Sequence, residues 1–369
     1  MRVLISTWAW RSHYYPLVPF VWALLAAGHE VRVACQPSLV PAVAATGVPV
    51  VPVGEDLDLA KVYAEMAAAG EISHDTESTK ITPGNIIVRY AEAVVDDLVA
   101  FGRSWRPDVV VHEPFNLAAM AAAQILCVPV VKHLWAADFT AIYGLDPAVA
   151  SRFGLSALRT DSDLVLDPCP AAMQLPGDAS PRALMRFVPY NGDAVLPEWL
   201  RTPGSRPLVC VTWGTLMAEL GSDLFLAPQV AEALGELDVD VVVTTDPASH
   251  PRFGPLPPNV FLASPQLALH LVLPSCAAVV HMGGAGTTMT AMAAGVPQLV
   301  LPQVGDQQFN AAQLAKTGAG LIGDVEGVAG QVSSLLSDPS FAEAAADLAR
   351  ENASRPSPAQ IVAELMTLL

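Results

Sequence analysis

The sequence predicts an α/β fold with two doubly wound domains, each built around a parallel sheet. Short β-branched segments such as Arg2–Ser6, Glu30–Cys35 and Leu208–Thr212 alternate with helical stretches in both halves of the chain. This alternation is typical of parallel sheets covered by helices. The chain has 369 residues, enough for two domains of ordinary size that each bury a core.

In the first half, the loop between the strand Arg2–Ser6 and the helix Leu17–Ala27 carries His13 among aromatic residues. Ligand sites of open α/β sheets form at this carboxyl edge of the strands. His13 is a candidate general base, because an imidazole titrates near neutral pH. The neighbouring rings offer flat apolar walls to a ring-containing ligand: Trp8, Trp10 and Tyr14. The alternative is a loop histidine with a structural role.

Two further strands of this half end in residues that suit a site. The strand Asp108–Pro114 contains Glu113 near its end, and the strand Pro129–Val131 is followed by His133 and Trp135. These side chains are expected at the same sheet edge as His13. Glu113 could equally be a carboxylate that faces solvent, and the other two could be core residues. A mobile loop is predicted over Glu71–Pro83.

Proline and glycine divide the chain into its predicted domains. Extended segments over Leu164–Pro170 and Arg186–Asn191 end the first domain, and a linker follows over 192–207. The N-terminal domain is therefore expected over 1–191 and the C-terminal domain over 208–352. The turn after the first strand of the C-terminal domain contains Gly214 and Thr215, which suit a phosphate oxygen.

The most informative stretch is a glycine-rich corner in the second half. A strand over 277–280 leads to His281, and the corner Gly283, Gly284, Ala285 and Gly286 opens a helix that continues through Thr287. Backbone N–H groups without a helical partner and the helix dipole make such a corner an anion site. The spacing matches neither G-x-G-x-x-G nor G-x-x-x-x-G-K-[ST]. The alternative is a packed turn with a core histidine.

Composition excludes several classes of protein. Charged residues make up 15% of the chain and hydrophobic residues 52%, which excludes a disordered protein. The formal net charge of −17 argues against nucleic-acid and anionic-membrane partners. The five cysteines are scattered without metal-ligand spacing and indicate reduced thiols in a cytoplasmic protein. The first residues do not form a signal peptide, and there is no apolar run long enough to span a bilayer.

Two stretches carry a family resemblance. HMGGAGTTMTAMAAGVPQLVLPQVGDQQFNA resembles the nucleotide-sugar signature of inverting family 1-type glycosyltransferases of bacterial secondary metabolism, which act on macrolide, anthracycline and enediyne-type antibiotics. SHYYPLVPFVWALLAAGHEVRVACQP is similar to their N-terminal hallmark. The chain departs from the family at Met282, where a second histidine or a cysteine is usual, and at Ser12, where glycine is usual.

The resemblance implies the GT-B fold, with two facing Rossmann-like domains and the active site between them. A C-terminal helix within 353–369 would cross back to the first domain. His13 would be the catalytic base, and Glu113 would stand where the family has the aspartate that orients it.

The resemblance also assigns the donor-binding residues. Diphosphate contacts would come from Thr215, His281, Thr287 and the glycine-rich corner. Ser264 and Gln266 match the segment that cradles the base, and Asp306 and Gln307 would meet the sugar.

The implied reaction is a metal-independent, cofactor-free transfer of a hexose-type sugar, with inversion, to a hydroxyl of a hydrophobic, polyketide-like aglycone in antibiotic biosynthesis. Thr290 replaces the acidic residue that grips the ribose in many relatives, which favours a TDP-deoxysugar as donor. Acceptor contacts are expected from five residues: Trp8, Trp10, Tyr14, His133 and Trp135. Two alternatives are a C-glycosyltransferase on an aromatic polyketide and a non-catalytic nucleotide-sugar-binding or auxiliary protein. A homodimer and a need for an auxiliary activator protein stay open.

Overall fold

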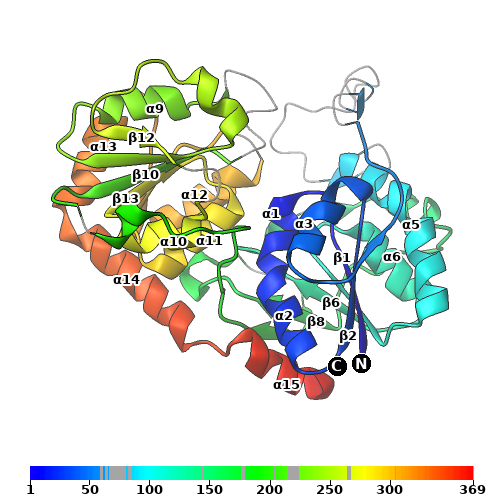
Figure 1. Cartoon of the computed structure of the whole chain (residues 1–369). Helices are drawn as coiled ribbons and strands as arrows, with labels where there is room; N and C mark the ends of the chain where they lie inside the picture. The colour runs from blue at the N-terminus through cyan, green and yellow to red at the C-terminus, as the bar shows by residue number, and fades with distance from the viewer. Residues whose placement is uncertain are drawn as a thin grey trace. The chain divides into compact units, whose positions relative to one another are not determined.

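Two α/β units make up the computed structural model (Figure 1). The described residues are 1–58, 61–62, 65, 80–81, 85–142, 144–175, 179–202, 204–214, 224–263, 267–303 and 305–368. Unit 1 comprises Met1–Pro168, Leu175–Met185 and Pro356–Leu369, and unit 2 comprises Cys169–Gln174 and Arg186–Arg355. The domain boundaries expected from the sequence, with a linker over 192–207, stay a proposal.

Unit 1 is built on a seven-stranded parallel sheet in the order β3-β2-β1-β5-β6-β8-β9. The strands are β1 (Arg2–Ser6), β2 (Glu30–Cys35), β3 (Val50–Pro52), β5 (Val109–His112), β6 (Val130–His133), β8 (Leu164–Asp167) and β9 (Arg182–Leu184). The winding direction reverses between β1 and β5. Doubly wound sheets bind their ligands at the carboxyl ends of the strands that flank such a reversal.

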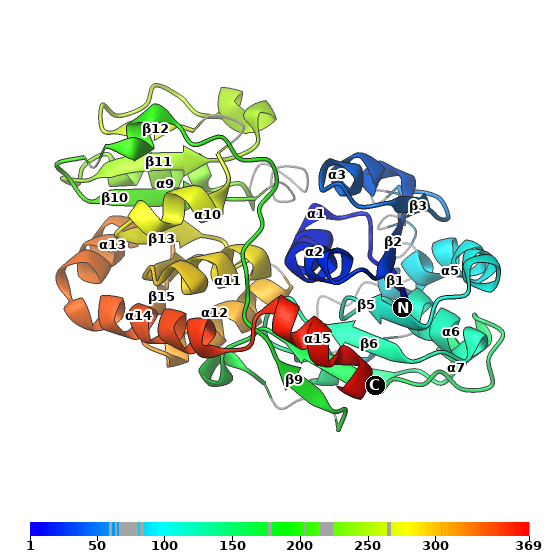
Figure 2. The same cartoon turned by 60° about the horizontal axis from the view of Figure 1, so that its bottom comes forward.

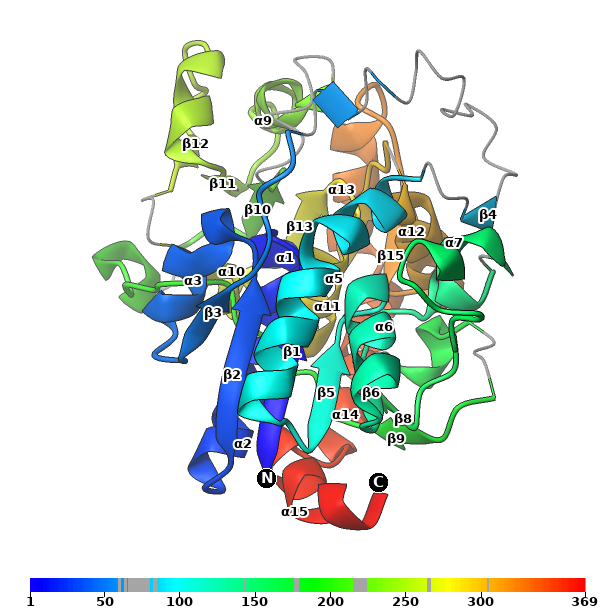
Figure 3. The ribbon, with the colours of Figure 1, turned by 90° about the vertical axis from the view of Figure 1, so that its right-hand side faces the viewer.

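Helices cover both faces of this sheet, so its strands are apolar on both sides. They are α1 (Arg11–Tyr14), α2 (Val18–Ala26), α3 (Val40–Ala45), α5 (Ile86–Trp105), α6 (Leu117–Leu126) and α7 (Ala148–Ser151). Leu4 and Val110 share one core cluster with α5 and α6, which lie side by side in Figure 3. On the other face, the ring of Phe20 in α2 lies 5.7 Å from that of His133. A separate two-stranded ladder pairs β4 (Lys80–Ile81) with β7 (Gly144–Leu145).

Unit 2 repeats the plan with a six-stranded parallel sheet in the order β12-β11-β10-β13-β14-β15. The strands are β10 (Leu208–Thr212), β11 (Asp240–Thr244), β12 (Val260–Leu262), β13 (Ala278–His281), β14 (Gln298–Val300) and β15 (Gly320–Ile322). The winding direction reverses between β10 and β13. The glycine-rich corner follows β13 and therefore lies at this reversal.

The helices of unit 2 also cover both faces of its sheet. They are α9 (Ala227–Leu234), α10 (Leu269–Val272), α11 (Ala285–Ala294), α12 (Asp306–Lys316), α13 (Val328–Ser337) and α14 (Pro339–Ser354). Val209 and Val280 pack with α9 and α13 in one cluster. Cys210 and Val279 pack with α11 in another. Alternate residues of each buried strand thus serve opposite helical layers.

The last helix, α15 (Pro358–Leu368), returns to unit 1 and packs on α2 (Figure 2). Its buried face consists of Ile361, Val362 and Leu365. The predicted fold class, including this returning helix, is confirmed. In the part of the chain that the structure describes, no helix is both long enough and apolar enough to cross a membrane. The predicted loop over 71–83 lies outside the described residues, except for β4.

Candidate active site

The candidate site of unit 1 is a histidine and a carboxylate that follow neighbouring strands. β1 and β5 pair in parallel with Ser6 opposite His112, so the residues after them leave the sheet side by side. Glu113 Oε1 lies 3.6 Å from His13 Nδ1, and neither atom has a hydrogen-bond partner among the residues that the structure describes. The other carboxylate oxygen of Glu113 accepts a bond from the Phe115 N–H at 2.9 Å. The carboxylate is therefore oriented toward the imidazole.

Aromatic rings surround the His13 imidazole. Trp8 stacks on it with ring centroids 5.3 Å apart, and Tyr90 of α5 stacks on Trp8 in turn at 4.5 Å. Trp10 meets the imidazole edge-on at 5.0 Å, and Trp135 lies 4.4 Å away. Trp8 and Trp135 are buried, whereas Trp10 is half-buried. These contacts fix the plane of the ring and leave Trp10 as the most accessible of the three indoles.

Two of the expected acceptor-binding residues lie in the core of unit 1. Tyr14 is fully buried, and its hydroxyl bonds with the Thr46 hydroxyl at 2.8 Å. His133 is 1% exposed and its Nδ1 donates to the Leu134 carbonyl at 2.8 Å. Burial lowers the pKa of His133 to about 4. Both side chains thus act in packing here, and the direct acceptor contact expected of them stays a prediction.

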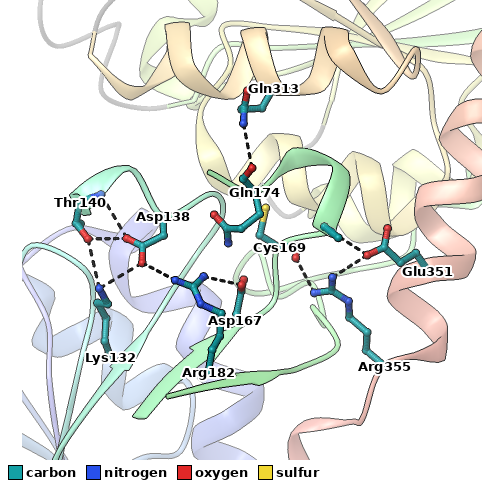
Figure 4. Close-up of polar contacts among 11 residues, drawn as sticks. Lys132, Asp138, Thr140, Asp167, Cys169, Gln174, Arg182, Gln313, Glu351 and Arg355 are labelled. Carbon is teal, nitrogen blue, oxygen red and sulfur yellow. Dashed lines mark hydrogen bonds and ion pairs between the residues drawn. The ribbon is translucent and has the colours of Figure 1, made fainter. Parts of the chain in front are cut away.

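A buried ion network supports the loop that carries Trp135 (Figure 4). Asp138 follows this loop and is paired with Lys132 Nζ at 3.3 Å and with Arg182 Nη2 at 3.1 Å. Arg182 also binds Asp167 at the end of β8, at 2.7 Å. The Asp138 and Asp167 carboxylates are almost fully buried. The positive charges of Lys132 and Arg182 are therefore balanced by the negative charges of Asp138 and Asp167.

The candidate site of unit 2 is the corner between β13 and α11. Gly283 has φ +93°, and a Cβ placed there would lie 2.8 Å from Val300 Cγ1 and 3.0 Å from the Gln307 carbonyl oxygen. Only glycine fits this position. Gly284 is the N-cap of α11, whose first backbone bond runs from the Thr288 N–H to the Gly284 carbonyl at 3.0 Å. The amides of residues 285–287 precede that bond, have no acceptor within the helix, and carry the positive end of its dipole.

His281 lies inside this corner and is 1% exposed. Its Nδ1 accepts from the Gly283 N–H at 3.0 Å, so the remaining proton is on Nε2, which donates to Gln298 Oε1 at 3.0 Å. Burial lowers the pKa of this imidazole to about 4, against the opposing effect of the Gln298 bond. Both nitrogens are thus engaged within unit 2. The sequence led us to expect that the His281 imidazole contacts the diphosphate directly. That contact stays a prediction, because both ring nitrogens bond within the protein here.

Other donor-binding residues expected from the sequence fall partly outside the described residues. Thr215, Ser264 and Gln266 belong to the segments 215–223 and 264–266, which the structure does not describe. Gly214 is described: it has φ +62°, and a Cβ there would lie 2.9 Å from Met282 Cε. The loops after β10 and β13 therefore lie against each other through the Met282 side chain.

The residues expected to meet the sugar begin α12. Asp306 is its first residue and is half-buried, with Oδ2 accepting from Asn310 Nδ2 at 3.2 Å. Gln307 is 4% exposed, and its Oε1 accepts from the Gln303 N–H at 2.9 Å. Asp306 is thus the more accessible of the two side chains, while Gln307 also closes the loop before the helix.

Comparison with known families matches both halves of the chain to one family. Residues 22–214 match the N-terminal domain of the erythromycin biosynthesis protein CIII-like family, and residues 228–368 match its C-terminal domain. The chain belongs to this family of GT-B glycosyltransferases. The erythromycin biosynthesis protein CIII-like family acts in antibiotic biosynthesis, as the resemblance in the sequence implied, and the expectation of a glycosyltransferase is confirmed.

Characterised relatives of the family resemble the chain over its whole length. It is 35% identical to the 10-deoxymethynolide desosaminyltransferase of Streptomyces venezuelae, with 100% of this chain and 97% of the relative covered. It is also 35% identical to the aklavinone 7-beta-L-rhodosaminyltransferase of Streptomyces galilaeus, with 100% and 96% covered.

Solved structures give the same result. The spinosyn forosaminyltransferase SpnP matches with a TM-score of 0.84 and 33% identity over 100% of this chain and 99% of that one. The spinosyn rhamnosyltransferase SpnG, in complex with thymidine diphosphate, matches with a TM-score of 0.83 and 30% identity over 99% and 100%. SpnG has also been solved in complex with the spinosyn aglycone.

Three side chains of this site were missed in the sequence. Tyr90 supports Trp8, Gln298 binds His281, and Asn310 binds both Gly283 and Asp306. Gln298 could have been found as a polar residue inside the apolar segment 296–301. Asn310 could have been found by its i+4 spacing from Asp306, once a helix was recognised there. Tyr90 had no signal, because a tyrosine on the buried face of an amphipathic helix is ordinary.

Proposed function

We propose that the chain is an inverting glycosyltransferase that moves a deoxysugar from a TDP-sugar to a hydroxyl of a hydrophobic, polyketide-like aglycone. The observation that carries this proposal is the His13–Glu113 pair, 3.6 Å apart at the winding reversal of unit 1. Its carboxylate is held by the Phe115 N–H. A non-catalytic binding protein has no use for an oriented base of this kind.

His13 acts as the general base. Its Nδ1 faces Glu113, so Nε2 takes the proton of the acceptor hydroxyl. The acceptor oxygen then attacks the anomeric carbon from the face opposite the diphosphate, and the carbon–oxygen bond to the diphosphate breaks. Glu113 stabilises the imidazolium through Nδ1–H. The separation of 3.6 Å closes to a hydrogen bond on a small rotation of the ring, as catalytic pairs tighten when substrate binds.

The glycine-rich corner takes up the negative charge of the departing diphosphate. Backbone amides of residues 285–287 and the Thr287 and Thr215 hydroxyls bind its oxygens. His281 contributes by holding the Gly283 N–H, and Asp306 accepts hydrogen bonds from the sugar hydroxyls. The thymidine diphosphate complex of SpnG supports this choice of nucleotide.

The state of Thr290 supports a deoxyribose donor. The hydroxyl of this 1% exposed residue donates to the Gly286 carbonyl at 2.6 Å and accepts from Asn191 Nδ2 at 3.2 Å. Because the hydroxyl already donates its proton and accepts one hydrogen bond, it would hold a ribose 2′-hydroxyl less firmly than a carboxylate would. TDP is therefore expected to compete better than UDP for the site, in a direct competition assay. Preference for UDP would end this part of the proposal.

The acceptor binds against the aromatic wall beside His13. Trp10 supplies the accessible face, while Trp8 and Trp135 fix the imidazole from its other sides. Indole faces suit a large apolar aglycone. NMR of the product distinguishes a sugar attached to an oxygen of the aglycone from one attached to a carbon.

The test is a His13→Ala variant assayed with a panel of TDP-deoxysugars and polyketide aglycones, with products identified by mass spectrometry. Transfer is expected to fall by a factor of about 100 or more. Binding of thymidine diphosphate, measured by calorimetry, is expected to persist. Unchanged turnover would remove His13 from its role. Absence of transfer by the wild-type chain, alone and with a candidate activator protein, would contradict the proposed reaction.

A further inference from the structure

One buried side-chain amide connects the glycine-rich corner to Asp306. Asn310 of α12 is 1% exposed, and its Nδ2 donates to the Gly283 carbonyl at 2.9 Å and to Asp306 Oδ2 at 3.2 Å. Both partners are acceptors, so they determine which end of the amide carries the protons. The bond to Gly283 reaches the proposed phosphate corner, and the bond to Asp306 reaches the proposed sugar contact.

We infer that Asn310 is a positioning residue that holds the phosphate corner and the sugar-binding carboxylate in a single arrangement for the donor. The inference rests on the proposed function, because it takes the donor to be bound by the corner and by Asp306. Asn310 acts through these two residues, with no contact of its own to the donor required.

The Gly283 peptide shows why such a residue is needed. Glycine has more backbone freedom than any other residue, and Gly283 must keep φ +93°. Its N–H is held by His281 Nδ1 and its carbonyl by Asn310 Nδ2. The carbonyl of one residue and the N–H of the next point in opposite directions across a trans peptide. Asn310 therefore also sets the direction of the Gly284 N–H at the start of α11.

The Asp306 carboxylate is oriented by the same amide. Asp306 and Asn310 are one helical turn apart on α12, so their side chains lie on one face. A hydrogen bond to an ionised carboxylate is stronger than a neutral one. Loss of this bond would remove one of the contacts that orient the carboxylate, and the sugar would meet it in fewer productive complexes.

The experiment compares Asn310→Leu with a matched control on the same helix. Gln313 is also buried, and its Nε2 donates to the Met173 carbonyl at 3.2 Å and to the Gln174 carbonyl at 3.3 Å. Figure 4 shows the contact with Gln174. Gln313→Leu therefore removes a buried amide from α12 without touching Gly283 or Asp306. Thermal unfolding of both variants measures the purely structural cost.

We expect Asn310→Leu to weaken the binding of thymidine diphosphate by about 10-fold or more, as measured by calorimetry. Gln313→Leu is expected to leave this affinity within about twofold, although both variants lose thermal stability. Equal effects of the two substitutions on affinity, or no effect of Asn310→Leu, would overturn the inference. If Asn310→Leu does not fold, Asn310→Ala carries the same comparison with the same expected result.

A double-mutant cycle tests the link to the sugar. TDP-glucose serves as the sugar-bearing probe, and its affinity is compared with that of thymidine diphosphate. Asp306→Ala is expected to weaken the binding of TDP-glucose and to leave the affinity for thymidine diphosphate almost unchanged. In the Asn310→Leu background the same substitution is expected to cost less than in the wild type, because the carboxylate has already lost its bond to Asn310. Fully additive effects would contradict the positioning role.

The outcomes separate this inference from the proposed function. If the wild-type chain binds neither thymidine diphosphate nor TDP-glucose, the proposed function fails and the inference fails with it. If the wild-type chain binds both and Asn310→Leu and Asn310→Ala bind as the wild type does, only the inference fails.

Discussion

Glu113 Oε1 lies 3.6 Å from His13 Nδ1, and the opposite oxygen of the same carboxylate is held by the Phe115 N–H. The two residues come from loops after β1 and β5, which are neighbours at the winding reversal. The carboxylate is therefore prepared to receive Nδ1–H when His13 takes up a proton. This geometry is available to a glutamate, which stands where the family resemblance in the sequence implied an aspartate.

Glu113→Gln tests the contribution of that charge. The amide keeps the length of the side chain and is able to accept from the Phe115 N–H, but it cannot stabilise an imidazolium. We expect kcat to fall by a factor of about 100 or more. Binding of thymidine diphosphate, measured by calorimetry, is expected to stay at the wild-type value. A variant with the wild-type kcat would show that Glu113 has no part in the reaction.

The buried histidines predict a stability that falls in mild acid. Burial lowers the pKa of His112, His133 and His281 from 6.5 to about 4. Between these values the unfolded chain binds protons that the folded chain does not. The free energy of unfolding is therefore fully maintained above pH 6.5 and decreases as the pH falls toward 4. Urea unfolding at a series of pH values between 5 and 7 measures this slope.

His133→Asn isolates one of these rings. The asparagine amide is able to replace the Nδ1–H bond to the Leu134 carbonyl, but it does not titrate. The pH slope of the unfolding free energy between pH 5 and 6.5 is expected to fall by about one proton relative to the wild type. An unchanged slope would mean that His133 is protonated in the folded chain.

Gly283 and Gly286 form a matched pair for the corner. An alanine Cβ at Gly283 meets Val300 and the Gln307 carbonyl at a positive φ, whereas a Cβ at Gly286 meets nothing within 4 Å. Gly283→Ala is expected to lower the unfolding free energy by about 2 kcal/mol and to abolish binding of thymidine diphosphate. Gly286→Ala is expected to leave the unfolding free energy unchanged or to raise it by up to about 1 kcal/mol, because alanine favours the helix. Denaturant unfolding distinguishes the two, and equal stability would contradict the strained backbone at Gly283.

Asp138 is the centre of the ion network in unit 1, and its removal leaves Lys132 and Arg182 short of a counter-charge. Asp138→Ala is expected to lower the unfolding free energy by about 3 kcal/mol or more, because breaking a buried pair strands a desolvated charge. Asp347→Ala is the control, since the Asp347–Arg350 pair is about two-thirds exposed on both sides and should contribute little. Denaturant unfolding measures both, and similar values would mean that the buried network is fully hydrated.

The alternation of strands and helices was predictable because it depends on local apolar pattern. Arg2–Ser6, Glu30–Cys35 and Leu208–Thr212 form strands with the expected bounds. The pattern failed where an element is short or polar. Arg182–Leu184 forms β9 without an apolar run, β15 over Gly320–Ile322 has only three residues, and the polar helix α12 begins directly at Asp306. Pairing with a neighbouring strand or packing on a sheet decides these elements, and neither can be read from local sequence.

The candidate site was predictable where chemistry follows the end of a strand. The sequence put His13 and Glu113 after separate strands, and the family resemblance implied their pairing. The structure brings these two side chains together. The sequence could not foresee that both nitrogens of His281 are occupied, because the Gln298 partner lies on a different strand. It also could not foresee that Tyr14 turns into the core, since a loop tyrosine has no periodic pattern.

The placement of α15 has a consequence for biosynthesis of the chain. The helix α2 comes early in the chain, whereas α15, with its buried residues Ile361, Val362 and Leu365, is synthesised after the whole of unit 2. The surface of α2 that packs against α15 is therefore uncovered while unit 2 is translated. Native packing of α2 is expected only once α15 has been made.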